Sequence, residues 1–509
     1  MGSERSITQT GGREASTGFI PGDYSLAVGM PSTRPPKGWR WTKLTDLARL
    51  ESGHTPSRKF PEHWDGDVCW IGIRDATANH GQTIYDTNQH TTELGINNSS
   101  ARMLPKNTVC LCRTASVGYV IVMGKEMATS QDFVNWVCLK DLYYHFLKYI
   151  LLSENRSFLR FASGTTHQTI YFPEVKAFHV CHPPLPEQKA IAHILGSLDD
   201  KIELNRRLNA TLEQMAQALF KSWFVDFDPV IDNILAKNMA KCPSPSLSQV
   251  ERDRAGSSPS GRSGDEGSIF DGIPDELAER AQVRSQALAN GTANREAAKN
   301  FPAAFQLTEE MGWIPEGWEV KDFGSIAQNI RTPADPTILP EDTPYVGLEH
   351  IDRQVFSLTK WGCASDVDSQ KARFESSDFL FGKLRPYFHK VCQVQAEGIC
   401  STDILVIRPK ENIFSGFVGC QIFEPDFVEY ANLRSTGTRM PRASWKDMAK
   451  YEIALPGPQL IEAFNNIIQP KRTKCKRTVG ETLTLAKLRD TLLPKLISGE
   501  LHISEGVIN

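Results

Sequence analysis

The sequence lacks long apolar runs and paired cysteines. No stretch of about 18 apolar residues occurs in the chain, so we expect no membrane-spanning helix. Residues 1–34 are rich in Ser, Gly and Thr and have no apolar signal-peptide core, and we expect them to be a disordered tail. The eleven cysteines form no C-x-x-C pair, and the tight cysteine–histidine group is His179, Cys181 and His182. This usage favours reduced thiols in a cytosolic core, with a zinc site at that group as the alternative.

The short motifs that mark common catalytic sites are also missing. The chain has no NPP[FY] or DPPY tetrapeptide, which amino-methyltransferases use to bind the target base. It has no GxGxxG after an expected strand, and no HExxH or GxSxG. Gly124-Lys125 and Gly382-Lys383 lack the following Ser or Thr and the upstream glycine of a P-loop. We therefore expect neither catalytic residues nor metal ligands in this chain.

An excess of basic charge is absent as well. The chain has 57 Lys and Arg against 60 Asp and Glu, for a net charge of −3. With this balance of charges, the chain as a whole is not a polycation. It leaves nucleic-acid binding open, because phosphate contacts need only a local basic face.

One long helix pattern is present, in the stretch LPEQKAIAHILGSLDDKIELNRRLNATLEQMAQALFKSWFVDFDP at 185–229. Glu187 follows Pro186 in a first turn, where a negative charge suits the helix dipole. Apolar residues then recur at alternating steps of three and four, as in a coiled coil, and two asparagines lie on the same seam. The helix predicted from Glu187 to Trp223 is about 55 Å long and needs a partner to bury that seam. The seam comprises Leu195, Leu198, Ile202, Asn205, Asn209, Leu212, Leu219 and Trp223.

An internal duplication supplies the partner. Pro36-Lys37-Gly38-Trp39 recurs as Pro315-Glu316-Gly317-Trp318, an offset of 279 (318 − 39). Further matches follow in the same order while the offset drifts to about 270, so one domain occurs twice with small loop insertions and deletions. These matches are Trp70–Ile73 with Tyr345–Leu348, Thr108–Leu111 with Asp378–Phe381, Ser130–Phe133 with Ser401–Ile404, and Gly164-Thr165 with Gly437-Thr438.

The duplication includes a second long helix, predicted from Gln459 to Ser498. Leu485, Leu488 and Leu492 lie on its seam. Its middle is basic, and Pro470 is expected to kink or delay it. We expect the two helices to pair antiparallel and to bury both seams.

Each repeat begins with a globular head of mixed α/β pattern. Strand-like runs occur at 117–123, 133–139, 378–381 and 404–407, and an amphipathic helix pattern at 142–161. The predicted fold class is α+β, with two mixed α/β domains separated by two long antiparallel coiled-coil helices in a pseudo-two-fold repeat. The predicted segments are a tail at 1–34, a first head at 35–185, a helix at 186–230, a flexible Ser/Pro-rich linker at 231–312 that can hold a short helix at 274–289, a second head at 313–457, a helix at 458–501 and a tail at 502–509.

Basic and polar residues gather in loops of both heads. Arg, Asn, Gln and Thr read base edges, and Lys and Arg bind phosphate, whereas a solvated surface is the alternative for each residue. The glycine-flanked loops at Gly164 and Gly437 favour DNA binding because both copies keep a polar loop beside a helix entry. Asp132 and Asp403 occupy equivalent positions and are expected to form turn or strand-end hydrogen bonds rather than to act as acids. The candidate DNA-binding residues are Arg58, Lys59, Arg74, Arg113, Thr114, Thr165, Thr166, His167, Gln168, Lys360, Lys383, Arg385, Tyr387, Arg439 and Arg442.

Together these patterns resemble the specificity (S) subunit of Type I restriction–modification systems. The resemblance spans about residues 35–501, whereas the N-terminal tail and the Ser/Pro-rich insertion depart from the family pattern. It rests on PxGW at the start of each half, LPEQ at Leu185–Gln188, LDDKIELNRRLNATLEQMAQALFKSWFVDFDP in the middle, IPEGWEV at Ile314–Val320 and LRDTLLPKLISGEL at Leu488–Leu501.

The resemblance implies that the heads are target recognition domains for a bipartite site on double-stranded DNA, and that the paired helices set the gap between its halves. It also implies docking to two modification subunits, which carry S-adenosylmethionine and methylate adenine N6, and to restriction subunits, which use ATP and Mg²⁺. The paired helices are expected to dock the modification subunits, with the seam residues of both helices as the candidate interface. The chain itself would bind no cofactor and catalyse no step, and it would act in the cytoplasm of a bacterium or archaeon, away from membranes.

Two other functions stay open from the residues alone. One is a free-standing methyltransferase or nuclease, which would modify DNA without partner subunits. The other is a coiled-coil scaffold that binds only protein and gives no sequence-specific DNA complex. Heads that share an apolar frame but differ in their loops argue against the scaffold, because a scaffold has no need for two different readers.

Overall fold

The computed structural model describes residues 18–164, 168–241, 268–437 and 439–503. The chain divides into two compact units: unit 1 consists of Met1–Ile202 with Thr484–Asn509, and unit 2 of Glu203–Leu483. The predictions for residues 1–17, 242–267 and 504–509 and for Thr165, Thr166 and His167 lie outside the described residues. Within the described residues, no helix combines the length and the apolar character that crossing a membrane requires.

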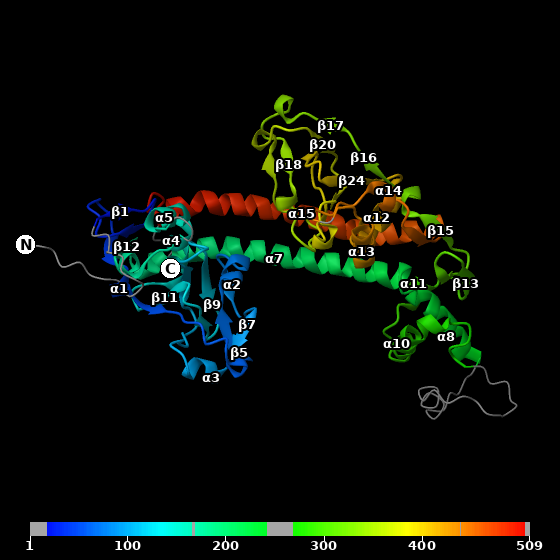
Figure 1. Ribbon diagram of the computed structural model, residues 1–509, viewed down its shortest axis with the longest axis horizontal. Helices are drawn as coiled ribbons and strands as arrows, with labels where there is room; N and C mark the ends of the chain where they lie inside the picture. The colour runs from blue at the N-terminus through cyan, green and yellow to red at the C-terminus, as the bar shows by residue number, and fades with distance from the viewer. Residues whose placement is uncertain (1–17, 165–167, 242–267, 438, 504–509) are drawn as a thin grey trace, which may run out of the picture. The chain divides into compact units, whose positions relative to one another are not determined.

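The described residues of unit 1 form three sheets (Figure 1). Strands β8 and β9 are buried along their whole length, which explains their continuous apolar sequence. The four-stranded sheet has the order β1 (Ile20–Pro21), β2 (Leu26–Val28), β12 (Phe178–His182), β3 (Arg40–Lys43). The five-stranded sheet has the order β4 (Ala48–Ser52), β11 (Phe133–Cys138), β8 (Val109–Cys112), β9 (Val120–Met123), β6 (Thr83–Ile84), and the three-stranded sheet β10 (Ala128–Thr129), β5 (Trp64–Ile71), β7 (Gln89–Thr91).

Short helices accompany these sheets: α1 (Leu44–Leu47), α2 (Ile73–Ala78), α3 (Glu93–Asn97), α4 (Tyr144–Ser153), α5 (Asn155–Phe161) and α6 (Phe172–Lys176). The helix pattern predicted at 142–161 is thus divided into α4 and α5 at Glu154.

Glu154 explains why the prediction of a disordered tail is wrong for residues 18–34. Its buried carboxylate accepts hydrogen bonds from the backbone N–H groups of Tyr24 and Ser25, both at 2.8 Å, and of Leu26 at 3.1 Å. These bonds fix the turn between β1 and β2, and β2 then pairs antiparallel with β12. The composition of residues 18–34 suggests disorder, whereas the stabilising partner lies about 130 residues away.

The described residues of unit 2 repeat much of this topology. Its four-stranded sheet has the order β16 (Ala327–Ile330), β24 (Ile404–Pro409), β21 (Phe379–Gly382), β22 (Val391–Gln393), which matches β4-β11-β8-β9 of unit 1. The pair β15 (Glu319–Asp322) and β25 (Glu452–Leu455) matches β3 and β12. The remaining strands form a sheet β17 (Pro333–Ala334), β20 (Lys371–Phe374), β23 (Gly398–Cys400), β18 (Pro344–Val346), β19 (Gly362–Cys363) and a hairpin of β13 (Phe305–Thr308) and β14 (Gly312–Pro315). The helices of this head are α12 (Ser415–Gln421), α13 (Pro425–Leu433) and α14 (Trp445–Met448).

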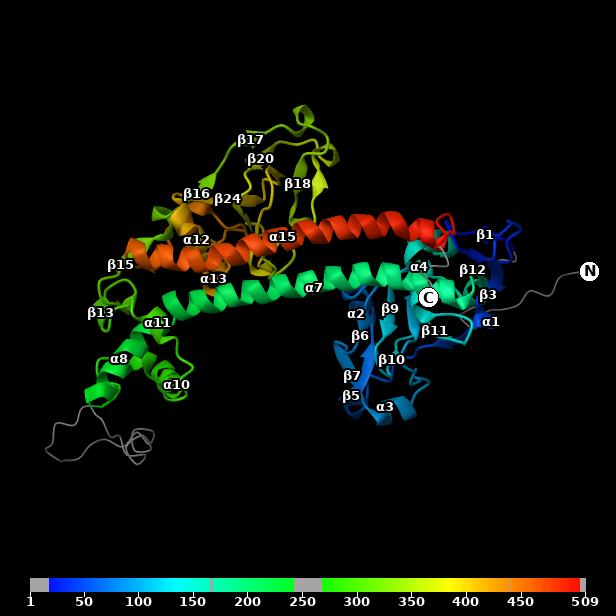
Figure 2. The same ribbon diagram turned by 180° about the vertical axis from the view of Figure 1, so that it is seen from behind.

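The segment 231–312, predicted as a flexible linker, contains packed structure in its described part. Helix α8 (Asp228–Lys241) lies against α10 (Ala278–Ala289), near α11 (Arg295–Ala298), as both views show (Figure 2). Arg280 forms a two-pronged ion pair with Asp228, with both contacts at 2.6 Å, and Arg284 forms one with Asp232 at 2.8 and 2.5 Å. Both carboxylates are buried, so these pairs fasten the two helices together.

Two 40-residue helices, α7 (Leu185–Phe224) and α15 (Pro458–Ile497), continue through both units. They confirm the helices predicted from Glu187 to Trp223 and from Gln459 to Ser498 to within two residues at each end, whereas the helix segments given as 186–230 and 458–501 extend six and four residues too far. Helix α15 is continuous from Pro458 through Pro470, so the predicted delayed start is not observed. Each helix is about 60 Å long at about 1.5 Å per residue.

The two helices pair antiparallel within each unit. In unit 2, Asn205 Nδ2 donates to Glu481 Oε2 at 3.0 Å, and the rings of Phe220 and Phe464 are 6.0 Å apart. In unit 1, Arg489 Nη1 donates to Asp199 Oδ1 at 2.9 Å. The predicted seam of α7 is buried or half-buried throughout, as are Leu485 and Leu492 of α15. Leu488 is 46% exposed and does not lie on the intramolecular seam, whereas its assignment as a subunit-interface residue stays a prediction.

The PxGW motif of each repeat packs against the end of the other repeat's long helix. In unit 1, a Cβ on Gly499 (φ +72°), just past the end of α15, would lie 2.8 Å from Pro36 and 3.3 Å from Trp39. In unit 2, the Trp318 ring lies 5.9 Å from Phe224 and 5.7 Å from Phe227, at the end of α7. Each unit therefore combines parts of both repeats.

Candidate nucleic-acid interface

In unit 1, the segment that follows β8 is hydrogen-bonded to the described ends of the glycine-flanked loop. Arg113 N–H donates to the Asp132 carbonyl at 2.8 Å, and the Arg113 carbonyl accepts from Ile170 N–H at 2.9 Å. Ala115, whose φ is +62°, donates to the Gln168 carbonyl at 3.2 Å. These bonds hold the end of β8, the start of β11 and the polar loop together.

Unit 2 repeats the same backbone frame after β21. Lys383 N–H donates to the Asp403 carbonyl at 3.0 Å, and the Lys383 carbonyl accepts from Ala443 N–H at 2.9 Å. Arg385, whose φ is +51°, donates to the Pro441 carbonyl at 2.8 Å. The main chain is equivalent in the two units, whereas the side chains that it carries differ.

In unit 1, Arg113 is the anchored member of this group. It is 7% exposed, its Nη2 donates to the Gln131 carbonyl at 3.0 Å, and its guanidinium lies 4.9 Å from the Phe172 ring centre. Burial lowers the pKa of Arg113, and the nearby Asp132 carboxylate opposes that shift. Thr114 is half-buried and Gln168 is exposed, so these two side chains are available to a partner beside a fixed arginine.

A second set of basic residues in unit 1 comprises Arg58, Lys59 and Arg74, of which Arg58 stacks on aromatic rings. The Arg58 guanidinium is 4.3 Å from the Trp64 ring centre and 5.8 Å from that of Trp70, and its Nη2 donates to Gln89 Oε1 at 2.8 Å. Lys59 and Arg74 are exposed. A stacked, planar and exposed guanidinium can bind phosphate or a base edge.

In unit 2, the frame brings Lys383, Arg385 and Arg442 together. Arg442 Nε lies 3.2 Å from Asp403 Oδ1 in a half-exposed ion pair. The guanidiniums of Arg385 and Arg353 lie 6.0 Å and 3.9 Å from the Phe388 ring centre.

The remaining candidates of unit 2 are placed differently. Tyr387 is 51% exposed beside Phe388, and Arg439 is exposed. Lys360 forms an ion pair with Asp352 at 2.7 Å and is not part of the frame. Arg353 is not among the DNA-binding candidates predicted from the sequence, because nothing in its loop predicts that it stacks on Phe388.

Asp132 and Asp403 form local hydrogen bonds, as expected from their equivalent positions. Asp132 accepts from the Ser130 hydroxyl at 3.0 Å, and Asp132 N–H donates back to that hydroxyl at 3.2 Å. The N–H of Asp403 donates to the Ser401 hydroxyl at the same 3.2 Å distance. Both aspartates thus close the turn before a strand.

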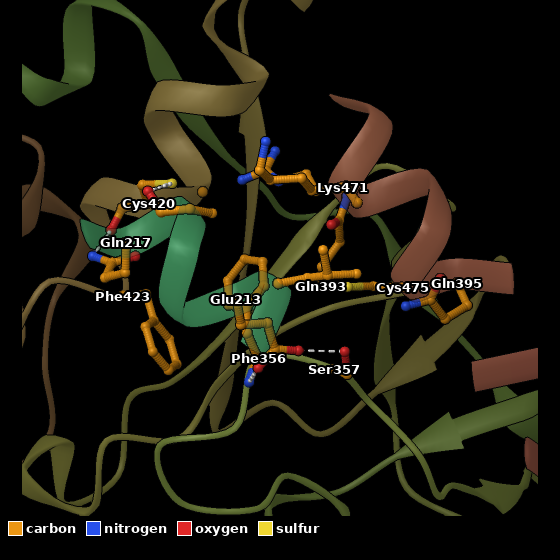
Figure 3. A pocket seen from close by; sticks show the side chains of 14 residues that line it. Glu213, Gln217, Phe356, Ser357, Gln393, Gln395, Cys420, Phe423, Lys471 and Cys475 are labelled. Atoms are coloured by element: carbon orange, nitrogen blue, oxygen red, sulfur yellow. Dashed lines mark hydrogen bonds between the residues drawn. The ribbon is translucent and has the colours of Figure 1, made fainter. Parts of the chain in front are cut away.

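A cavity of about 40 Å³ in unit 2 lies between α7, α15 and the head (Figure 3). Glu213 accepts hydrogen bonds there from the Ser357 hydroxyl and, at 3.2 Å, from Phe356 N–H. Arg472 donates to the Ser415 carbonyl at 2.6 Å. Burial raises the pKa of Glu213 and lowers that of Arg472. The cavity has room for only a few water molecules, so these groups fasten the head to the helices rather than bind a ligand.

Unit 1 has a corresponding connection between its head and the helices. Asp199 of α7 accepts from the Tyr149 hydroxyl at 2.7 Å and lies 3.5 Å from Lys148 Nζ, both on α4. The same carboxylate accepts from Arg489 of α15. The helices therefore support the loops of each head through a hydrogen-bonded junction.

The zinc alternative at His179, Cys181 and His182 is not supported. His182 is hydrogen-bonded to the Thr42 hydroxyl at 3.0 Å and to the Pro183 carbonyl, and His179 to the Ala177 carbonyl. Within the described part of the chain, the set of His, Cys, Asp or Glu ligand atoms that meet within 4.8 Å belongs to Cys69, Asp86 and His90. Sequence reasoning missed this set because its spacings match no metal motif.

Comparisons with known proteins give matches to one family. Residues 36–214 match the family described as "Type I restriction modification DNA specificity domain". The Type I restriction enzyme MjaIX specificity subunit of Methanocaldococcus jannaschii is 25% identical over 496 residues, which cover 92% of this chain and 95% of the relative. The Type I restriction enzyme HindI specificity subunit of Haemophilus influenzae is 31% identical over 361 residues, 67% of this chain and 72% of the relative. The crystal structure of a Type-I restriction-modification S subunit from M. genitalium aligns with a TM-score of 0.47 and 16% identity over 90% of this chain and 96% of that chain.

Proposed function

The chain belongs to the family of DNA specificity subunits of Type I restriction–modification enzymes, and on that premise we propose that it binds a bipartite target on double-stranded DNA, with one half read by each unit. The observation that carries the proposal is the duplicated backbone frame. The same three hydrogen bonds position Arg113 and Gln168 in unit 1 and Lys383 and Arg385 in unit 2. A shared frame with different side chains suits two readers of different sequences.

The side chains at each frame have the chemistry that DNA recognition uses. In unit 1, Thr114 and Gln168 offer hydrogen-bonding groups to base edges, and Arg58, Lys59 and Arg74 offer positive charge to phosphates. In unit 2, Lys383, Arg385, Arg439 and Arg442 supply charge, and Tyr387 an exposed ring with a hydroxyl. We propose the same DNA-binding role for Thr165, Thr166, His167 and Lys360.

The helices α7 and α15 are proposed to dock two modification subunits, with restriction subunits joining the assembly. Their intramolecular seam is occupied, so docking requires other residues. Leu204 is 59% exposed and Met215 52% exposed, and they lie 11 residues apart (215 − 204) on α7. Eleven residues make about three helical turns, so both side chains lie on one face. Exposed apolar side chains on one helix face suit a protein partner.

The chain is proposed to supply no catalytic group. S-adenosylmethionine, ATP and Mg²⁺ would be bound by the partner subunits, and a target adenine would be flipped into a modification subunit. Asp132 and Asp403, which the repeat makes equivalent, each form a local hydrogen bond with the serine two residues earlier, and this supports the proposed division of roles.

Genome-wide methylation mapping tests the proposal. We expect N6-methyladenine in a bipartite motif with an unspecific gap, and its complete loss when the gene for this chain is deleted. Restoring the gene should restore the same motif. An unchanged methylation pattern in the deletion strain, or DNA methylation by the purified chain alone, would contradict the proposal.

A further inference from the structure

Strands β5 and β7 bring a thiol, an imidazole and a carboxylate together in unit 1. Cys69 and His90 are direct cross-strand partners in this antiparallel pair. Asp86 lies four residues before His90, in the loop that leads into β7. Cys69 Sγ lies 3.3 Å from Asp86 Oδ1 and 3.5 Å from His90 Nε2, and these last two atoms are 2.8 Å apart.

These distances fit three ligands of one tetrahedral ion. Zinc–ligand bonds of about 2.3 Å to sulfur and about 2.0–2.1 Å to nitrogen or oxygen place sulfur about 3.5 Å from either other ligand. They place nitrogen and oxygen about 3.3 Å apart. The two sulfur distances agree within a few tenths of an ångström, and the His90–Asp86 contact needs to lengthen by about half an ångström.

The ring nitrogens of His90 that face Cys69 and Asp86 distinguish a metal site from a catalytic triad. A Cys–His–Asp triad needs one ring nitrogen toward the thiol and the other toward the carboxylate. Here the same atom, His90 Nε2, faces both Cys69 and Asp86. One nitrogen, one sulfur and one oxygen therefore converge on a single point.

The loop that carries Asp86 is held in place without an ion. The Thr87 hydroxyl accepts from Trp70 N–H at 3.2 Å and donates to the Gln89 carbonyl at 2.8 Å. Asn88 donates from its backbone and its side chain to Asp75 Oδ1, at 2.8 and 2.7 Å. Such support preorganises ligands and strengthens metal binding.

We propose that Cys69, Asp86 and His90 form a binding site for Zn²⁺ or an ion of similar softness, with a fourth position on the exposed side of Asp86. Cys69 is 2% exposed, whereas the Asp86 side chain is 75% exposed, so a water molecule can complete the tetrahedron. A thiolate and an aspartate balance the charge of a divalent ion. Sulfur and nitrogen donors select zinc over Mg²⁺ or Ca²⁺. The ion would fix β7 against β5 beside Arg58. The proposal of this metal site does not depend on the proposed DNA-binding function.

Zinc titration of the full-length chain tests the site. The chain is stripped with a chelator under reducing conditions, and zinc is titrated against a chromophoric chelator. We expect about one equivalent of Zn²⁺, insensitive to excess Mg²⁺, with affinity reduced about 10-fold or more in Cys69→Ser, His90→Gln and Asp86→Asn. Cys363→Ser, at a half-buried free thiol of unit 2, is the matched control and should bind like the unaltered chain.

Cobalt supplies a second measurement. Co²⁺ should give a near-ultraviolet thiolate charge-transfer band that Cys69→Ser removes and Cys363→Ser keeps. Should Cys69→Ser fail to fold, Asp86→Asn still decides, because Asp86 is an exposed loop residue whose replacement leaves the core intact. Zinc binding that is absent, or equal in Asp86→Asn, His90→Gln and the unaltered chain, overturns the proposal.

Discussion

The buried Asn209 of α7 accepts a hydrogen bond from the hydroxyl of Thr478 on α15. Asn205 makes a second polar contact one turn away, with Glu481. Antiparallel helices with an apolar seam can slide by whole turns, and a buried polar pair is satisfied in one alignment only. These two contacts therefore fix the register of α7 against α15 in unit 2.

Removing one member of the Asn209–Thr478 pair should destabilise unit 2. Thr478→Val leaves the Asn209 carbonyl without this donor and should cost about 1–3 kcal/mol in the free energy of unfolding. The double variant Asn209→Leu/Thr478→Val should recover most of that loss, because neither side chain then needs a partner. Denaturant unfolding measures both values. Thr491→Val, at an exposed threonine of the same helix, is the control and should change stability by no more than about 0.5 kcal/mol.

His145 should make the stability of unit 1 fall in mild acid. Burial, and then the neighbouring Lys148 charge, lower the pKa of His145 from 6.5 to about 4 in the folded chain. As pH falls from about 6.5 to about 4, the unfolded state takes up a proton that the folded state does not, so folding stability decreases across this window. Melting temperatures measured from pH 7 to pH 5 should fall less in His145→Gln than in the unaltered chain. Equal slopes would contradict a half-buried imidazole that stays neutral in the folded chain.

Exchange of the unit 1 head should change one half of the DNA target. Residues 18–184 replaced by the corresponding segment of a relative with another target should alter one half of the methylated motif and preserve the other. An otherwise identical exchange of residues 35–184 leaves β1 and β2 from the original chain and should fold less well, because β2 pairs with β12. A change in both halves of the motif would exclude separate reading by the two units.

Arg442 should contribute to discrimination in one half of the target. Arg442→Ala removes a half-exposed guanidinium held by Asp403. If it contacts a base edge, the assembled complex should lose about 1–3 kcal/mol of discrimination at that half alone. Binding to matched and mismatched duplexes measures the loss. Lys321→Ala, at an exposed lysine paired with Glu319 on β15, should bind both duplexes as before.

The exposed face of α7 should be required for assembly. Leu204→Glu/Met215→Glu should weaken association with the modification subunits while leaving the melting temperature unchanged, because both side chains are exposed. Co-purification and calorimetry measure the two effects. Leu212→Asp is the informative contrast, since Leu212 lines the cavity beside Glu213 and a charge there should destabilise unit 2 itself. Normal assembly of the double variant would remove this face from the interface.

The sequence was sufficient to predict the long helices, because their apolar residues are periodic, and the repeat, because its matches keep the same order along the chain. The seam from Leu195 to Trp223 predicted α7, and the strand-like runs at 133–139 and 404–407 correspond to β11 and β24. Thr478, Val479 and Thr482 are buried on α15. The sequence did not predict their burial, because threonines beside a run of basic residues do not form an apolar coiled-coil pattern.

Features stabilised by distant partners could not be predicted. Strands β1 and β2 depend on Glu154, and the α8–α10 pair depends on Asp228 with Arg280 and on Asp232 with Arg284. At the candidate interface, residue types identified Lys383, Arg385 and Arg442, but their convergence depends on backbone bonds between segments about 20 to 60 residues apart. The stacking of Arg353 on Phe388 has no local signal at all.

The division between the two units falls inside α7, after Ile202, and inside α15, before Thr484. The chain passes from one unit to the other only within these helices, so the loops of both heads lie outside the connecting segments. Duplication or deletion of whole heptads at this boundary would alter the connection without touching a residue of either recognition frame. Under the proposed function, mutation can therefore change the recognised sequence and the spacing between its two halves as two separately inherited traits.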